Sequence, residues 1–265
     1  MKIIIVQFIL LTECVCALCA QDVRFRPLTG KESVEVKQKL ESFDKGTATL
    51  DSLTDSQEWT MKLLEYYVMH TNKVTTKMKL PIAKSYAVWG KYPEAVTLAQ
   101  DYVNVYSNDW RGWRVLGGCK LITGSYSEAL DALTNAVCLG DKQNYAALGF
   151  AALKVDRLDV FKSMVAPYLL MLINNTEQFP EKERNQMRGL LIAYALKIDN
   201  KPIFIKAIAG FDLSTISQWE ELKDLIVQGC DRFKGTDIDK IRKELETNVG
   251  ESINSTSTNA PPPAK

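Results

Sequence analysis

The sequence contains very few of the residues that most enzymes use to move protons or to hold metals. Its 265 residues include a single histidine, His70, which ends an apolar segment. No serine lies in a nucleophile elbow, and no glycine-rich segment matches a phosphate-binding loop. Metal sites need several ligands at characteristic spacings, which are lacking here. The sequence therefore predicts a protein that is not an enzyme and that has no metal site and no cofactor.

Long hydrophobic runs are also lacking. The apolar run at residues 3–11 is far shorter than the roughly 20 residues that a membrane-spanning helix needs. Lys2 precedes this run, and small residues ending at Ala20 follow it, which is the pattern of a secretory signal peptide. We expect cleavage after Ala20, with cleavage after Cys19 as the alternative. A lipid anchor on Cys16 or Cys19 stays open as a second interpretation, although a bulky residue precedes each.

Cysteine is sparse in the chain that cleavage would leave. Cys119, Cys138 and Cys230 remain, and an odd, widely spaced set of three is not a disulfide framework. We expect all three to be small buried side chains.

Excess charge of either sign is missing as well. The formal net charge is +1, and the predicted cleavage removes one basic and one acidic residue. Nucleic-acid-binding domains are usually strongly basic, so nucleic acid is not the expected partner. No segment alternates apolar and polar residues as a half-buried strand does. The predicted fold class is all-α.

What is present is a repeated pattern, clearest between residues 113 and 136. Large residues, small residues and a turn glycine alternate there in a fixed order: Trp113, Leu116, Gly117, Gly124, Tyr126, Ala129, Leu133 and Ala136. The same order recurs 34 residues upstream around Gly90 and Ala95, and 32 residues downstream from Tyr145 to Phe161. A weaker repeat pairs Asp156 with Asp199, 43 residues further on.

This pattern resembles the tetratricopeptide repeat (TPR), in which small residues let two antiparallel helices approach closely. The resemblance is clear over residues 77–173 and implies a right-handed solenoid of antiparallel helix hairpins. Lys120 and Asp141 depart from the family pattern, which usually has Tyr and often has Pro at these positions. For the best hairpin, we expect Gly117 to face Ala129.

The predicted organisation has four parts. Residues 1–20 are the signal peptide, and residues 21–53 are an extension that includes a helix at 32–43. Residues 54–248 are the helical repeat domain, and residues 249–265 are a disordered tail rich in Ser, Thr and Pro.

The candidate site is a surface. In TPR solenoids the concave side is lined mainly by the first helix of each hairpin. Residues at these positions that point away from the packing interface form a basic stripe with one aromatic ring: Lys77, Lys84, Arg111, Arg114 and Phe150. Such a stripe suits an acidic peptide, or one with a free C-terminal carboxylate.

The sequence therefore predicts a noncatalytic scaffold or adaptor that binds a protein or peptide and is located in the periplasm or secreted. The alternative is a helical accessory domain or subunit of an enzyme whose active site has no recognisable motif. Cross-linking to a partner would favour the first, and a pocket with perturbed carboxylates would favour the second.

Overall fold

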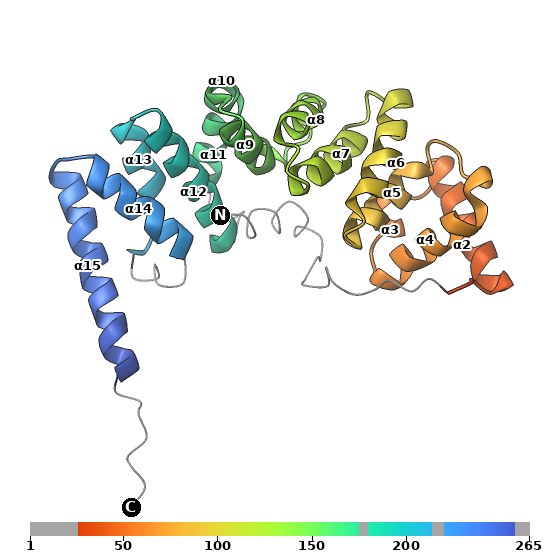
Figure 1. Cartoon of the computed structure of the whole chain (residues 1–265), viewed down its shortest axis with the longest axis horizontal. Coiled ribbons are helices and arrows are strands. Elements are labelled where there is room, and N and C mark those ends of the chain that lie inside the picture. The colour runs from red at the N-terminus through yellow and green to blue at the C-terminus, as the bar shows by residue number, and fades with distance from the viewer. Residues whose placement is uncertain (1–25, 175–179, 214–219, 258–265) are drawn as a thin grey trace, which may run out of the picture. The chain divides into compact units, whose positions relative to one another are not determined.

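A computed structural model describes residues 26–174, 180–213 and 220–257, and over these ranges every regular element is a helix. The predicted all-α class is confirmed. Within each of the two units described below, neighbouring helices pack against one another (Figure 1). The predicted signal peptide and residues 258–265 lie outside the described residues.

The described residues form two compact units, and the division between them falls after Asp156. In the N-terminal unit the elements are α2 (Gly30–Asp44), α3 (Leu50–Leu53), α4 (Gln57–His70), a 3-10 turn (Thr71–Lys73), α5 (Lys79–Val88), α6 (Tyr92–Val105), α7 (Trp110–Ile122), α8 (Tyr126–Cys138) and α9 (Tyr145–Lys154). In the C-terminal unit they are α10 (Leu158–Val160), a π-helical turn (Phe161–Val165), α11 (Ala166–Ile173), α12 (Glu181–Lys197), α13 (Lys201–Ile208), α14 (Glu220–Arg232) and α15 (Thr236–Ser257).

This division differs from the predicted one at three places. The boundary after Asp156 lies inside the region expected to be one repeat domain. The expected N-terminal extension is part of the first unit, because α2 packs against α4, and α3 packs against α5. At the other end, α15 continues to Ser257, beyond the expected start of a disordered tail at residue 249.

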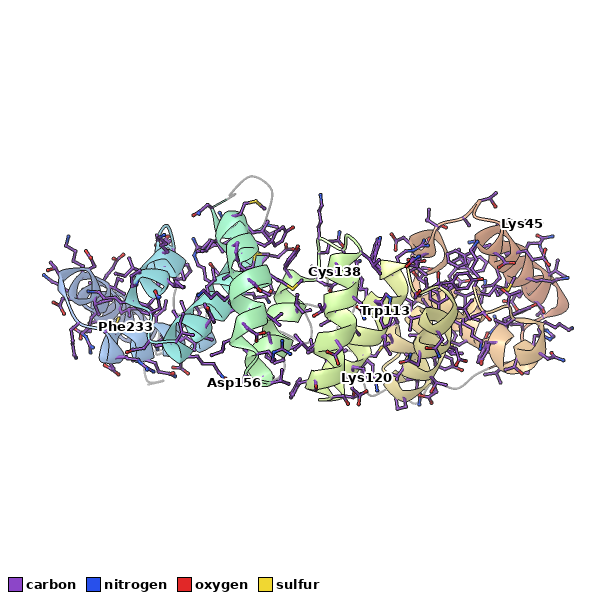
Figure 2. The ribbon with its side chains drawn as sticks, turned by 90° about the horizontal axis from the view of Figure 1, so that it is seen from above. Lys45, Trp113, Lys120, Cys138, Asp156 and Phe233 are labelled. Carbon is purple, nitrogen blue, oxygen red and sulfur yellow. The ribbon has the colours of Figure 1, made fainter. Side chains whose placement is uncertain are left out.

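Within the N-terminal unit, helices pack in pairs and the pairs pack on each other. Helix α5 contacts α6 and α7, while α7 contacts α8 and α9. Only three residues separate α7 from α8. Lys120 near the end of α7 and Cys138 at the end of α8 therefore appear at opposite edges in Figure 2. A contiguous row is formed by the first helices of successive pairs, because α5 contacts α7 and α7 contacts α9.

The turn inside each pair uses a left-handed residue. Gly90 and Gly124 have φ of 71° and 83°, which glycine adopts without steric cost. After Gly124, the Ser125 amide donates to the Lys120 carbonyl at 2.9 Å, which is the closing bond of a Schellman helix end. Asp156 and Asp199 are the non-glycine residues with positive φ among the described residues, at 61° and 55°. They occupy equivalent places in the third and fourth copies of the sequence pattern.

Close packing inside the best hairpin depends on Gly117. A Cβ atom added there would lie 2.7 Å from Cγ of Leu133 and 3.2 Å from its backbone nitrogen. The nearest atoms thus belong to Leu133, one helical turn after the predicted partner Ala129. Glycine lets α7 approach the backbone of α8, and Leu133 fills the space beside it.

The C-terminal unit packs around α12, which contacts α11, α13 and α14. The ring of Phe161 stacks on Tyr194 with centroids 4.5 Å apart. Buried Arg188 donates to the carbonyls of Ala207 and Ala209, where α13 ends. A guanidinium at a helix C-terminus meets the negative end of the helix dipole, which compensates part of its buried charge.

The three cysteines of the described chain are all free. Cys119 and Cys230 are buried as predicted, and burial raises the pKa of both thiols, that of Cys119 to about 12. Cys138 is exposed, so the prediction for it was wrong. It is the last residue of α8, where the helix emerges from its packing contacts.

Candidate surface on the first helices

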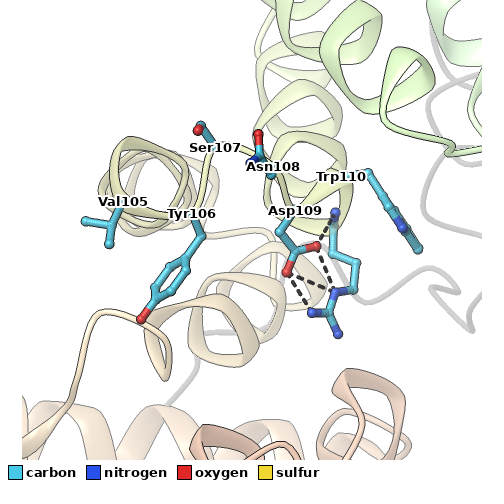
Figure 3. A pocket seen from close by; sticks show the side chains of 7 residues that line it. Val105, Tyr106, Ser107, Asn108, Asp109 and Trp110 are labelled. Carbon is cyan, nitrogen blue, oxygen red and sulfur yellow. Dashed lines mark hydrogen bonds and ion pairs between the residues drawn. The ribbon is translucent and has the colours of Figure 1, made fainter.

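Two of the predicted basic residues, Arg111 and Arg114, lie one turn apart on α7. Asp109 caps this helix by accepting from the Arg111 amide at 3.0 Å. The same carboxylate accepts from the Arg111 guanidinium, with Nη2 2.6 Å from Oδ2, as Figure 3 shows. The buried Tyr102 hydroxyl of α6 also donates to Oδ2 at 2.6 Å. Arg111 is therefore tied to its own helix cap and to the preceding helix.

This network sets the ionisation of its members. Burial alone would raise the pKa of Asp109, but hydrogen bonds from Arg111 and Tyr102 outweigh it and lower the pKa below its ordinary value. Burial and the bond to Asp109 raise the pKa of Tyr102 far above its ordinary value. At neutral pH, Asp109 is therefore a carboxylate and Tyr102 a neutral phenol.

Arg114 joins α7 to the loop before α9. Its Nε donates to Oδ2 of Asp141 at 2.9 Å, and its Nη2 donates to Oδ1. The side chain of Asp141 is fully buried and also accepts from the Gln143 amide and the Asn144 side chain. The departure from the TPR pattern at Asp141 thus has a structural reason, since this carboxylate organises the loop. The guanidinium of Arg114 also lies 4.4 Å from the ring centroid of Trp110.

The lysines of the predicted stripe have partners as well. Lys84 on α5 forms an ion pair with Asp51 of α3 at 3.0 Å, and its side chain is only 15% exposed. Lys77 donates to the backbone carbonyl of Asp44. Three of the four predicted cations thus have a carboxylate partner, and the fourth binds a backbone oxygen.

Phe150 differs most from its predicted place. It is 2% exposed in α9 and packs edge-on against Tyr126, with ring centroids 6.0 Å apart. The prediction that Phe150 lies on the partner surface was therefore wrong. Almost the whole of α9 is buried, and its residues are small or apolar on every side. The periodicity of the sequence therefore could not identify an outward face.

The structure also contains a groove that the sequence analysis missed. It has a volume of about 630 Å³ and lies between the end of α6 and the start of α7 (Figure 3). Its lining is Val105, Tyr106, Ser107, Asn108, Asp109, Trp110 and Arg111. Val105 is 62% exposed and Tyr106 is 36% exposed. Apolar residues in the short link between two hairpins were the available signal in the sequence, since such links are usually polar.

His70 is half-buried at the end of α4. Its ring lies 4.7 Å from that of Tyr66, and its Nε2 is 3.3 Å from the Ser33 hydroxyl. In the described parts of the chain, no group of three His, Cys, Asp or Glu side chains is placed to hold a metal ion. Across the same residues, no helix combines the length and apolarity needed to cross a membrane.

Comparisons with protein-family models, with curated proteins and with solved structures gave no match for this chain.

Proposed function

We propose that the protein is a noncatalytic scaffold of TPR-like helix hairpins that binds a protein or peptide partner. The observation that carries this proposal is the recurrence of one left-handed turn residue at Gly90, Gly124, Asp156 and Asp199, in step with the sequence repeat. Repeated hairpins stack into extended surfaces suited to binding chains rather than small molecules. In this proposal the stack is a right-handed solenoid.

The partner surface in this proposal is the row formed by α5, α7 and α9, together with the loops that precede these helices. The row is continuous because each of its helices contacts the next. Lys77, Lys84, Arg111 and Arg114 belong to it. Because their charges are already engaged, they position loops and helix ends, and an acidic partner would have to displace existing ion pairs.

We further propose that the mature chain begins near Gln21 and acts outside the cytoplasm. The support is Lys2, the apolar run at residues 3–11 and the small residues up to Ala20. N-terminal sequencing of the native protein should return a chain starting at Gln21 or at Ala20. An intact Met1 would count against secretion.

Site-specific photo-cross-linking tests partner binding. A cross-linker at exposed Asn108, before α7, should capture a discrete partner from native extracts. The matched control is a cross-linker at Asp131, which is exposed on the second helix α8. Equal capture at both positions, or at neither, would reject the first-helix surface.

A further inference from the structure

A separate, smaller pocket lies beside α4 in the N-terminal unit. Its volume is about 260 Å³, and its wall comes from α4, from the end of α5 and from the segment before α2. The charged and apolar residues of this wall are Arg26, Glu58, Met61, Lys62, Glu65 and Trp89. All of them belong to one compact unit, so the pocket has a defined geometry.

Glu65 is the unusual residue of this pocket, because its carboxylate belongs to a side chain in a residue only 4% exposed. Its Oε1 accepts from the Arg26 amide at 3.0 Å. Its Oε2 has no hydrogen-bond partner among the described residues, although this atom is not sealed from solvent. Acidic side chains are almost never buried unless a partner compensates the charge. Glu65 therefore lacks the partner that its burial requires.

The two cations in the wall have other partners. The Arg26 guanidinium donates to both carboxylate oxygens of Glu32, with Nη2 2.6 Å from Oε1. Glu32 also contributes most to the raised pKa of Arg26, and Glu65 contributes less. Lys62 Nζ lies 2.6 Å from Oε1 of Glu58. These ion pairs leave the charge of Glu65 unmatched, so the pocket is complementary to a cation.

The geometry of the site favours an alkylammonium group over a guanidinium. Since Oε1 of Glu65 already binds the Arg26 amide, one oxygen remains for a ligand. A guanidinium binds a carboxylate best through two parallel hydrogen bonds, whereas an ammonium is a compact charge that can donate to one oxygen. Met61 and Trp89 supply apolar surface for the alkyl stem. The indole Nε1 of Trp89 donates to Oγ1 of buried Thr60 at 2.9 Å, which fixes the ring.

Apolar surface continues along α4 beyond the pocket. Val68 is 55% exposed and Met69 is 47% exposed. They follow Glu65 by three and four residues, so they lie beside it on the helix surface. A free amine would leave this area uncovered, whereas apolar residues that flank a lysine in a partner chain would cover it.

We propose that this pocket binds a lysine side chain of a partner protein, with the ammonium at Oε2 of Glu65 and the alkyl stem against Met61 and Trp89. The inference goes beyond the proposed row of first helices, because most of the pocket wall belongs to α4. Binding here and partner capture at Asn108 can therefore fail independently.

The probe is N-acetyl-lysine N-methylamide, titrated into the isotopically labelled full-length protein. The indole N–H signal of Trp89 reports binding, and its loss in Trp89→Phe assigns it among the five tryptophans. The corresponding norleucine compound keeps the alkyl stem without the charge, and the arginine compound carries a guanidinium. A peptide with leucine on both sides of the lysine tests whether the ligand is a chain.

Two variants remove the open carboxylate in different ways. Glu65→Gln keeps an acceptor for the Arg26 amide but removes the charge. Met61→Lys places a competing ammonium one helical turn before Glu65. The matched control is Glu128→Gln, which removes the same charge from an exposed residue of α8 that pairs with Lys120. Circular dichroism establishes that each variant keeps its helix content.

We expect the lysine compound to shift the Trp89 signal saturably and to bind both variants roughly tenfold more weakly than the wild type and the control. The arginine compound should bind more weakly, the norleucine compound should cause no saturable shift, and the leucine-flanked peptide should bind more tightly. Undiminished binding to Glu65→Gln, an equal shift with norleucine, or no saturable shift in the wild type would each overturn the proposal. Equal affinity of the peptide and the single residue would overturn the assignment to a partner chain.

Discussion

At the residue scale, a few side chains that look like surface charges in the sequence hold the N-terminal unit together. Asp141 is the clearest case, because one buried carboxylate accepts from Arg114, Gln143 and Asn144. Buried charges are stable only with such partners. The cation and the carboxylate are 27 residues apart in the chain, so their pairing could not be predicted from the local sequence.

Asp141→Ala should destabilise the N-terminal unit strongly. Removing one partner of a buried ion pair typically costs about 3–5 kcal/mol, and we expect the lower end because Arg114 stays 26% exposed. Urea unfolding followed by circular dichroism measures the loss. Asp131→Ala, at an exposed position of α8, is the control and should change stability by less than about 0.5 kcal/mol.

Gly117→Ala should also destabilise the fold. The new Cβ would be 2.7 Å from Leu133 Cγ, and overpacking typically costs about 1–3 kcal/mol, more than the ~1 kcal/mol that alanine gains in helix propensity. Gly30→Ala is the matched control, because nothing lies within 4 Å of its Cβ position at the start of α2. Equal melting temperatures for the two variants would contradict the packing of α7 on α8.

The Asp109 network predicts that the free energy of unfolding falls at acidic pH. Because the pKa of Asp109 is lowered on folding, its contribution is complete above the ordinary value of 3.8 and is lost as pH falls through the folded pKa. Urea titrations between neutral pH and about pH 2 should show stability falling below about pH 4. The same titrations on Asp109→Asn should give a shallower fall, since this side chain no longer binds a proton.

At the element scale, helix ends determine where the repeats turn. Each hairpin closes on a residue with positive φ, which the chain supplies as glycine in two copies and as aspartate in two others. Aspartate tolerates this region better than most residues because its short side chain forms local hydrogen bonds. The repeat therefore persists in backbone conformation where its sequence signature has weakened.

Gly124→Ala tests this requirement. No atom lies within 4 Å of the Cβ position, so any loss of stability comes from φ of 83° and not from a clash. A left-handed alanine costs roughly 1–2 kcal/mol. Gly124→Asn should lose less, because asparagine adopts this conformation more readily. Thermal unfolding should thus rank glycine first, asparagine second and alanine last, and any other order would argue against the left-handed turn.

At the scale of the whole molecule, the division after Asp156 predicts separable folding. The apolar core formed by α2 to α8 lies entirely within the N-terminal unit. A fragment of residues 26–156 should therefore be helical by circular dichroism and unfold cooperatively. A fragment ending at residue 122 lacks α8 and should not unfold cooperatively. Absence of a cooperative transition in the longer fragment would show that the two units fold only together.

The sequence by itself determined the helical class, the repeated hairpins and the places where they turn, because these depend on local spacing of small, large and left-handed residues. Only the tertiary structure decided the character of the candidate surface. Burial of Phe150 and pairing of Arg111 and Arg114 with Asp109 and Asp141 depend on contacts between helices. The groove at Tyr106 likewise could not be predicted, since exposure is a property of packing and not of residue type.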